Sequence, residues 1–305
     1  MIDITLLGTS SAFPTKERNH PSIYVNLDGT RILLDCGEGT QRQIRKAGLS
    51  PAIDKIFLTH WHGDHSLGVG GIIQSSNMLG GQKQLEIFGP KGTTASVNKI
   101  VETYKFYSKL KIISKSIDAK RPLLVDKIGK WSVYALNVKH GTSCLGYRLK
   151  EDDSLNIKKD LLSKLGLRSG PYLSLLKKGK NVMYQGKLLK AKDMTYLKKG
   201  KILTYLTDLS YEPKLSRFAI GSDVLIIEAT FLSSEEKKAR KVYHLTVMDA
   251  LKVGKYSGAK KVVLVHQSQR YEGTNSVEEE VKVLKEKMNL KFEVMVGKDL
   301  EKIPI

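Results

Sequence analysis

The chain has 305 residues, of which 41% are hydrophobic and 27% are charged, as is typical of a globular protein with a substantial core. Lys and Arg number 51 against 31 for Asp and Glu, and this formal charge of +20 favours a polyanionic partner such as nucleic acid. A lysine-rich, thermophile-like surface is the alternative explanation. Two cysteines argue against a disulfide framework, and no apolar run is long enough to cross a membrane, so a cytoplasmic protein is expected.

Short apolar runs alternate with longer amphipathic segments along the chain. The runs predict buried strands at residues 4–7, 31–34, 55–58, 203–206, 224–227 and 262–265. One helix is expected from about Thr246 to Ser257, followed by Gly258 as its C-cap. Another is expected to begin near Ser276, where Glu279 would complete a capping box. Strands separated by helices predict an α/β architecture.

A polar side chain able to do chemistry follows most of these strands. In open α/β sheets, sites form beyond the carboxyl ends of the strands, so residues at several strand ends meet in one place. We therefore expect one convergent site, supplied by Asp35, His60, His140, Asp208, Glu228 and His266.

The segment of residues 151–200 breaks the pattern. It contains few strong strand runs, and its 12 basic residues against 5 acidic ones give a net charge of about +7. Gly166, Gly170-Pro171 and Gly179 interrupt it. We interpret it as an inserted basic arm within a chain that otherwise forms one domain over residues 1–305; a solvated linker or lid is the alternative.

The densest cluster of potential ligands is the sequence His60-x-His62-x-Asp64-His65. Four such residues within six positions cannot share one face of a helix or strand, but they fit a loop that wraps around metal ions. Neutral imidazoles and a carboxylate suit zinc and similar ions. A cluster of surface polar residues, the alternative, would not explain why distant partners also lie at strand ends.

The spacing of this loop predicts two metal ions rather than one. His60 and His62 can hold the first ion while Asp64 and His65 turn towards a second. Paired catalytic ions lie roughly 3.5–4 Å apart and are commonly bridged by a carboxylate. Asp208 is the best candidate for that bridge. The two shells would be completed by His140 and His266.

These motifs resemble those of the metallo-β-lactamase superfamily and, within it, the ribonuclease Z family of tRNA 3′-processing endonucleases. The metal loop is the superfamily signature, and residues 35–41, Asp-Cys-Gly-Glu-Gly-Thr-Gln, resemble a more specific motif of the family. The resemblance covers essentially the whole length. It also includes residues 7–10 with Pro14, Arg18 and Asn19, then 88–92, 139–141, and His266 with 268–271.

The resemblance implies an αβ/βα four-layer sandwich and assigns roles to individual residues. It implies metal ligands at His60, His62, Asp64, His65, His140, Asp208 and His266. It implies that Asp64 is the general base and that His244, oriented by Glu228, gives a proton to the leaving group. It also implies two Zn²⁺ ions per subunit, with Mn²⁺ or another divalent ion as the alternative.

Three departures from the family pattern stand close to these residues. Ile227 replaces a histidine before Glu228. Residues 206–209 lack the small residues usual around the bridging aspartate, and residues 243–246 read Tyr-His-Leu-Thr where Gly-His-Ser-Thr is common. The implied ligands and the His244–Glu228 pair are all present.

The resemblance further implies precursor tRNA as the substrate and a homodimer in which one subunit's arm holds the tRNA that the other cuts. Lys177 and Lys178 lie in the arm, whereas Arg18, Asn19 and Arg270 are candidates for contacts near the acceptor end; His20 is interpreted as structural. The expected products are a tRNA with a 3′ hydroxyl and a trailer with a 5′ phosphate. A general or cyclic-nucleotide phosphodiesterase and a catalytically weak tRNA-binding protein are the alternatives.

Overall fold

The computed structural model describes residues 2–79, 82–104 and 110–305. The chain divides into a larger unit, Met1–Leu149 with Ile202–Ile305, and a smaller unit, Lys150–Lys201. Each unit has its own cluster of buried apolar side chains. Among the described residues, none of the helices combines the length and apolar character that a membrane crossing requires.

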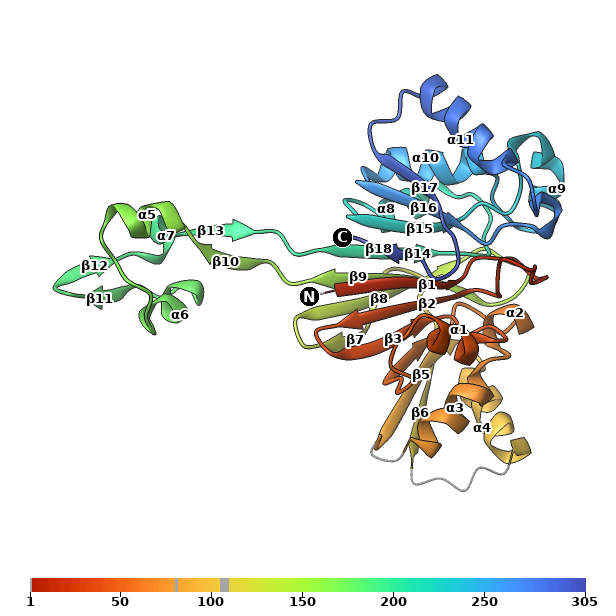
Figure 1. The fold of residues 1–305 in the computed structure, drawn as a ribbon, viewed down its shortest axis with the longest axis horizontal. Helices are drawn as coiled ribbons and strands as arrows, with labels where there is room; N and C mark the ends of the chain where they lie inside the picture. The colour runs from red at the N-terminus through yellow and green to blue at the C-terminus, as the bar shows by residue number, and fades with distance from the viewer. Residues whose placement is uncertain (1, 80–81, 105–109) are drawn as a thin grey trace. The chain divides into compact units, whose positions relative to one another are not determined.

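Two seven-stranded sheets form the centre of the larger unit (Figure 1). The order in the first sheet is β18 (Lys302–Ile303), β1 (Ile2–Gly8), β2 (Ser22–Leu27), β3 (Thr30–Leu34), β4 (Lys55–Phe57), β5 (Gln84–Pro90) and β6 (Lys111–Ile117). The order in the second is β17 (Glu293–Val296), β16 (Lys261–Val265), β15 (Val224–Glu228), β14 (Ile202–Leu206), β9 (Cys144–Glu151), β8 (Trp131–Val138) and β7 (Leu123–Ile128).

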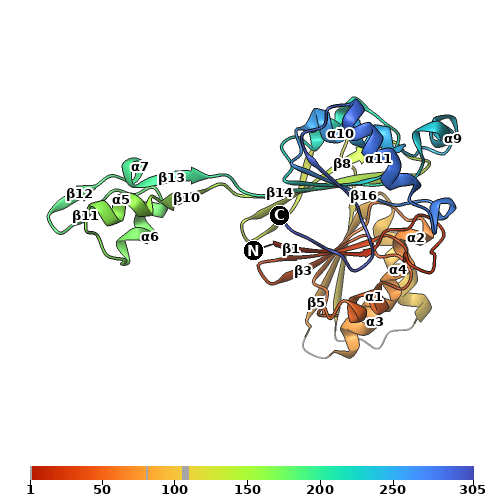
Figure 2. The ribbon, with the colours of Figure 1, turned by 45° about the horizontal axis from the view of Figure 1, so that its top comes forward.

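Helices cover the outer face of each sheet (Figure 2). The chain segments on the side of the first sheet are α1 (Thr40–Lys46), α2 (Gly63–Ser66), α3 (Val69–Met78) and α4 (Thr93–Tyr104). Those on the side of the second are α8 (Pro213–Phe218), η1 (Ser233–Glu235), α9 (Glu236–Lys241), α10 (Val247–Ser257), η2 (Gln269–Tyr271) and α11 (Ser276–Lys287).

Three apolar layers hold this arrangement together. Between the sheets, Phe57 stacks on Phe88 with ring centroids 4.6 Å apart, and Tyr147 meets Phe57 edge-on at 5.5 Å. Separate clusters join each sheet to its helices. Strands β15 and β16 are therefore buried on both faces, which explains why they read as continuous apolar runs. The predicted αβ/βα four-layer sandwich is confirmed.

The six predicted strands are present, with ends that differ by no more than two residues from the prediction. The helix near Ser276 also forms, but its predicted capping box is wrong. Ser276 lies inside the helix, and its hydroxyl donates to Thr274 Oγ1 at 3.0 Å instead of accepting a backbone N–H. A capping box is found on α10, where Thr246 accepts from the Asp249 N–H and Asp249 accepts from the Thr246 N–H. Gly258 ends that helix in the left-handed conformation, as predicted.

Parallel pairing brings the ends of separate strands to one edge. Strands β3 to β6 are parallel to one another in the first sheet, and β14 to β17 are parallel in the second. The register pairs Leu206 with Ile227 and Glu228 with Val265. The residues that follow these strands therefore lie side by side beyond the carboxyl edge of the sheet.

The smaller unit has two short hairpin-like sheets and three short helices among its described residues. Its elements are β10 (Ser154–Ile157), α5 (Lys159–Lys164), α6 (Tyr172–Lys177), β11 (Val182–Tyr184), β12 (Lys187–Leu189), α7 (Ala191–Met194) and β13 (Thr195–Lys198). Tyr172 stacks on Tyr184 with centroids 4.1 Å apart, and Leu176 is fully buried beside them. The unit thus has a folded core, which an unstructured linker would lack.

Candidate metal centre

The site begins where the backbone turns sharply after three strands. Asp35, Asp208 and His266 follow β3, β14 and β16, and all three have left-handed backbones, with φ of 59°, 53° and 60°. This conformation costs about 1–2 kcal/mol for a residue with a Cβ. Three strained residues, each following a strand, indicate that the surrounding structure fixes their conformation.

The structure brings the seven predicted ligands together as two sets and a shared carboxylate. His60, His62 and His140 form one group, and Asp64, His65 and His266 form another; within each, the ligand atoms lie within 4.8 Å of one another. These are the two sets that the spacing of the metal loop predicts.

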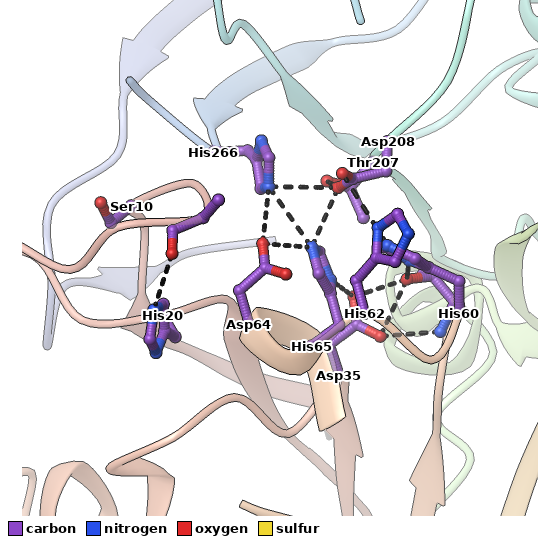
Figure 3. Close-up of polar contacts among 12 residues, drawn as sticks. Ser10, His20, Asp35, His60, His62, Asp64, His65, Thr207, Asp208 and His266 are labelled. Atoms are coloured by element: carbon purple, nitrogen blue, oxygen red, sulfur yellow. Dashed lines mark hydrogen bonds and ion pairs between the residues drawn. The ribbon is translucent and has the colours of Figure 1, made fainter. Parts of the chain in front are cut away.

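Asp208 lies between the two sets (Figure 3). Its Oδ1 is 3.9 Å from Nε2 of both His60 and His140. Its Oδ2 is 3.0 Å from Nε2 of His65 and 3.2 Å from Nε2 of His266. One oxygen faces each set, which is the geometry of a bridging carboxylate.

A single helical turn separates the ligands of the metal loop. His62 is the N-cap of α2, whereas Asp64 and His65 lie within that helix. The Cys36 N–H donates to the His65 carbonyl at 2.9 Å and so ties the turn to the segment after β3. The extended backbone before the turn directs His60 and His62 to one set, and the turn directs Asp64 and His65 to the other.

The fully buried Asp35 carboxylate orients the loop without belonging to either set. Oδ1 accepts from the Thr59 N–H at 2.7 Å. Oδ2 accepts from His65 Nδ1 at 2.8 Å and from the Tyr205 hydroxyl at 2.9 Å. Because Nδ1 of His65 is held in this way, its Nε2 is the atom that faces Asp64 and Asp208.

Thr59 fixes the orientation of His60 in a similar manner. Its hydroxyl lies 2.9 Å from Asp35 Oδ2 and 3.0 Å from His60 Nδ1. A carboxylate can only accept, so the hydroxyl donates to Asp35 and accepts from His60 Nδ1–H. The buried Nε2 of His60 then carries a lone pair, and it has no hydrogen-bond partner in the described structure. Burial lowers the pKa of His60 well below its usual value, which favours this neutral form.

Thr230 repeats this arrangement in the second sheet. Its hydroxyl contacts Glu228 Oε2 and lies 2.9 Å from His266 Nδ1. By the same reasoning it donates to the carboxylate and accepts from His266, leaving the lone pair of His266 Nε2 directed at Asp208. Each sheet therefore supplies a carboxylate–threonine–histidine chain.

His244 lies beside the two sets and is paired with the same glutamate. Its Nδ1 donates to Glu228 Oε2 at 2.8 Å, and its Nε2 is 3.8 Å from Asp208 Oδ1. Glu228 is fully buried and also accepts the Leu209 N–H at 2.7 Å. Burial alone would lower the pKa of His244, but the charge and hydrogen bond of Glu228 outweigh it and raise the pKa to about 9. The contact with Glu228 thus favours the protonated form of His244.

The donor set fits divalent metal ions. It consists of imidazole nitrogens and carboxylate oxygens, the ligands that zinc and similar ions prefer. Nε2 of His60 is a buried polar atom that a metal ion would satisfy. The charges of Asp64 and Asp208 would offset those of the ions. Burial would raise the pKa of Asp64, but its close contacts with the His266 and His65 imidazoles outweigh burial and lower it, which favours the ionised carboxylate.

The residues predicted to contact the substrate have different surroundings from one another. Arg18 donates to the Gly297 carbonyl at 2.6 Å, and the buried Asn19 side chain donates to the Glu38 carbonyl at 2.7 Å, so both brace loops. The guanidinium of Arg270 lies 5.4 Å from the ring centroid of Phe231. Lys177 and Lys178 are exposed in the smaller unit. Contact of these residues with RNA stays a prediction.

At two of the departures from the family pattern, the side chains face away from the ligands. Ile227 and Leu209 are fully buried in the apolar cluster between the second sheet and its helices. Successive residues of a strand face opposite sides, so Ile227 points into that cluster while Glu228 reaches the site. The histidine that stands here in the pattern would face this apolar cluster.

Sequence reasoning missed the side chains that orient the ligands. Thr59 adjoins His60 directly, but Thr230 is 36 positions from His266, and Tyr205 reaches Asp35 from the other sheet. No spacing rule indicates such contacts. The signal that the sequence offered for these contacts was a threonine or tyrosine close to the end of a strand.

Comparisons with known proteins agree with this architecture. A ribonuclease Z from Nanoarchaeum equitans is 40% identical over 276 residues, covering 89% of this chain and 85% of the relative. One from Methanococcus maripaludis is 36% identical and covers 97% of each chain. The family model described as anti-Pycsar protein Apyc1 matches residues 2–99.

Among solved structures, human tRNase Z, short form, has a TM-score of 0.72 at 24% identity and covers 99% of both chains. The metallo-β-lactamase fold protein YhfI of Bacillus subtilis has a TM-score of 0.67 at 19% identity, covering 99% of this chain and 98% of that one. Fold and site thus define a hydrolase with the metallo-β-lactamase fold. Within that class, the chain belongs to the ribonuclease Z family.

The carboxylate–threonine–histidine chains predict how a conservative substitution of the threonine affects metal binding. Replacing Thr230 with Val keeps the volume but removes the hydroxyl that holds His266. We expect metal affinity to fall by about 10–100-fold, the usual effect of losing a residue that orients a ligand. Competition with a chromogenic chelator measures the affinity. Thr230→Ser keeps the hydroxyl and should stay near the native value; equal affinity in the Val and Ser variants would contradict the role assigned to Thr230.

Proposed function

We propose that the protein hydrolyses the phosphodiester at the 3′ end of precursor tRNA and removes the 3′ trailer. Its membership of the ribonuclease Z family supports this proposal. The observation that carries it is the arrangement of two three-ligand sets around Asp208, with the His244–Glu228 pair alongside. That combination offers phosphate-binding charge and a proton donor in one place.

The proposed cofactor is a pair of Zn²⁺ ions per subunit, with Mn²⁺ or another divalent ion as the alternative. One ion would be held by His60, His62 and His140, the other by Asp64, His65 and His266, with Asp208 between them. When bound, such ions neutralise phosphate charge and lower the pKa of a bound water to about 7.

Asp64 is the residue proposed to act on the attacking water. Its carboxylate lies within 3.5 Å of His266 Nε2 and 3.2 Å of His65 Nε2, and it is one-tenth exposed. It can accept the water proton as the new oxygen–phosphorus bond forms. The contacts that lower the pKa of Asp64 keep its carboxylate unprotonated, which is the form that a general base requires.

His244 is the residue proposed to act on the leaving group. As the bond between phosphorus and the 3′ oxygen breaks, that oxygen takes the proton from His244 Nε2. Glu228 keeps the opposite nitrogen, Nδ1, in its hydrogen bond. The products would be a tRNA with a free 3′ hydroxyl and a trailer with a 5′ phosphate.

The direct test is to incubate the purified protein with a 3′-extended tRNA, with and without a chelator, and to map the cut. We expect one cleavage at the 3′ end of the tRNA body that stops with chelator and returns with added Zn²⁺. Asp64→Asn should abolish it. Hydrolysis of a small phosphodiester without cleavage of the precursor would favour the general phosphodiesterase instead.

Removal of the proton donor should slow the chemical step. General acid catalysis is typically worth 10²–10⁴-fold, so His244→Ala should lower single-turnover cleavage by about that factor while the bound metal is retained. Metal content is measured by atomic emission. Loss of metal in this variant would mean that His244 is a ligand and not the donor.

The pH profile provides the matching control. His244 donates only when protonated, so the rate should fall as pH rises through the pKa of His244. Glu228 raises that pKa, and Glu228→Gln removes the charge responsible. The alkaline limb of the profile should therefore move to lower pH in Glu228→Gln. An unchanged limb would rule out titration of His244 as its cause.

We further propose that the smaller unit binds the tRNA and that the protein acts as a homodimer. Lys177, Lys178 and Lys180 are exposed together at the end of α6, where they can neutralise phosphates. In the larger unit, the exposed apolar residues Met78 and Leu79 border a groove that also contains Ile44, and a second copy would cover it.

Mixing two variants tests tRNA binding by the smaller unit and assembly into a homodimer in one experiment. Lys177→Glu/Lys178→Glu should weaken precursor binding, and His244→Ala should stop cleavage, so each variant alone should be nearly inactive on precursor tRNA. If one subunit holds the tRNA that the other cuts, mixing the two variants should restore a substantial part of the activity. Sedimentation velocity checks that they assemble. Dimers without restored cleavage would contradict the division of labour, and monomers would contradict the homodimer.

A further inference from the structure

Tyr243 is an exposed aromatic residue in an unfavourable backbone conformation. Its φ is 60°, and 39% of its surface is exposed. The left-handed region disfavours residues with a Cβ, and glycine would adopt it without strain. Core packing does not explain a tyrosine at this position, because so much of the side chain is exposed. A left-handed residue is common where a helix ends, but it is usually glycine, so an exposed tyrosine there, beside the proposed catalytic site, points to a function for the side chain.

The left-handed conformation of Tyr243 belongs to the turn that ends α9, because Tyr243 directly follows the C-cap residue Val242. The Tyr243 carbonyl accepts a hydrogen bond from His140 Nδ1 at 3.4 Å, and its N–H donates to the Arg240 carbonyl at 3.4 Å. The next residue, His244, is fixed by its N–H bond to the Ala239 carbonyl and by Glu228. The backbone contacts therefore require this turn, but they do not require a tyrosine ring.

The ring lies at the edge of the site. Its centroid is 6.5 Å from that of His140, with the two planes at 80°. The exposed Gly141 lies next to the ring: a Cβ placed on this glycine would be 3.9 Å from the Tyr243 ring, and no other side chain or backbone atom would be nearer. His62, in the same ligand set as His140, is also exposed. This side of the metal centre is thus open, and the tyrosine ring borders the opening.

We propose that Tyr243 is the stacking surface for the nucleobase on the 5′ side of the scissile phosphate, the last nucleotide that the tRNA retains. This inference rests on the proposed function. His244, the adjacent residue, gives its proton to the 3′ oxygen of that nucleotide, so the nucleotide must lie on the same side of the site. Aromatic side chains bind unpaired bases by stacking, and they do so largely without regard to sequence.

The test compares Tyr243→Gly, Tyr243→Phe and Leu300→Gly with the native protein. Leu300 has a similar φ of 67° and a similar exposure of 37%, and it controls for loss of an exposed side chain at a strained position. Base stacking is worth about 5- to 150-fold in affinity. We expect Tyr243→Gly to raise KM for a 3′-extended tRNA within that range, at unchanged metal content, while Tyr243→Phe and Leu300→Gly stay near native values.

An abasic nucleotide in the substrate separates stacking from a structural role. With an abasic residue on the 5′ side of the cut, the native protein and Tyr243→Gly should have equal KM values. If the two proteins still differed in KM as much on that substrate, the proposal would be overturned. It would also be overturned if the KM difference disappeared only with the abasic residue on the 3′ side of the cut. Cleavage of the 3′-extended tRNA by the native protein tests the proposed function separately. If the native protein did not cleave it, the proposed function would be contradicted before any variant was compared.

Discussion

The buried carboxylate of Asp35 is the constraint on which the metal centre depends. It lies at the end of a strand in the first sheet, accepts hydrogen bonds from Thr59 and His65 of the metal loop, and accepts one from Tyr205 of the second sheet. An unpaired buried charge would destabilise the fold by several kcal/mol. These donors compensate that penalty, and only the assembled sandwich supplies all of them. The sheet packing and the ligand positions are therefore coupled through one side chain.

Glu228 has the corresponding position in the second sheet. It accepts from Thr230 and His244, as Asp35 accepts from Thr59 and His65. The two carboxylates thus orient the rings from opposite sides, and Asp208 lies between the resulting sets. The histidines that the two carboxylates hold differ in position. His65, held by Asp35, faces Asp64 and Asp208 within a ligand set, whereas His244, held by Glu228, lies beside the sets, where it can deliver a proton.

Much of this centre could be predicted because parallel strands bring distant residues to one edge. A polar residue after each apolar run located the ligands, and the short spacing of the metal loop divided them into two sets. Contacts made by side chains across the fold could not be predicted. The bond from Tyr205 to Asp35 depends on how the two sheets face each other, which no local pattern encodes. The capping box assigned to Ser276 failed for a local reason, because the helix begins one residue earlier than predicted and the Ser276 hydroxyl donates to Thr274.

The place where the smaller unit enters the chain has a consequence for how such enzymes diversify. The chain leaves the larger unit after Leu149, near the end of β9, and returns at the start of β14, and these two strands are neighbours in the same sheet. An excursion that starts and ends at adjacent strands can leave their register unchanged, and this excursion packs its own cluster of buried apolar side chains. Evolution can therefore lengthen, shorten or replace this unit while the metal ligands of the sandwich stay where they are.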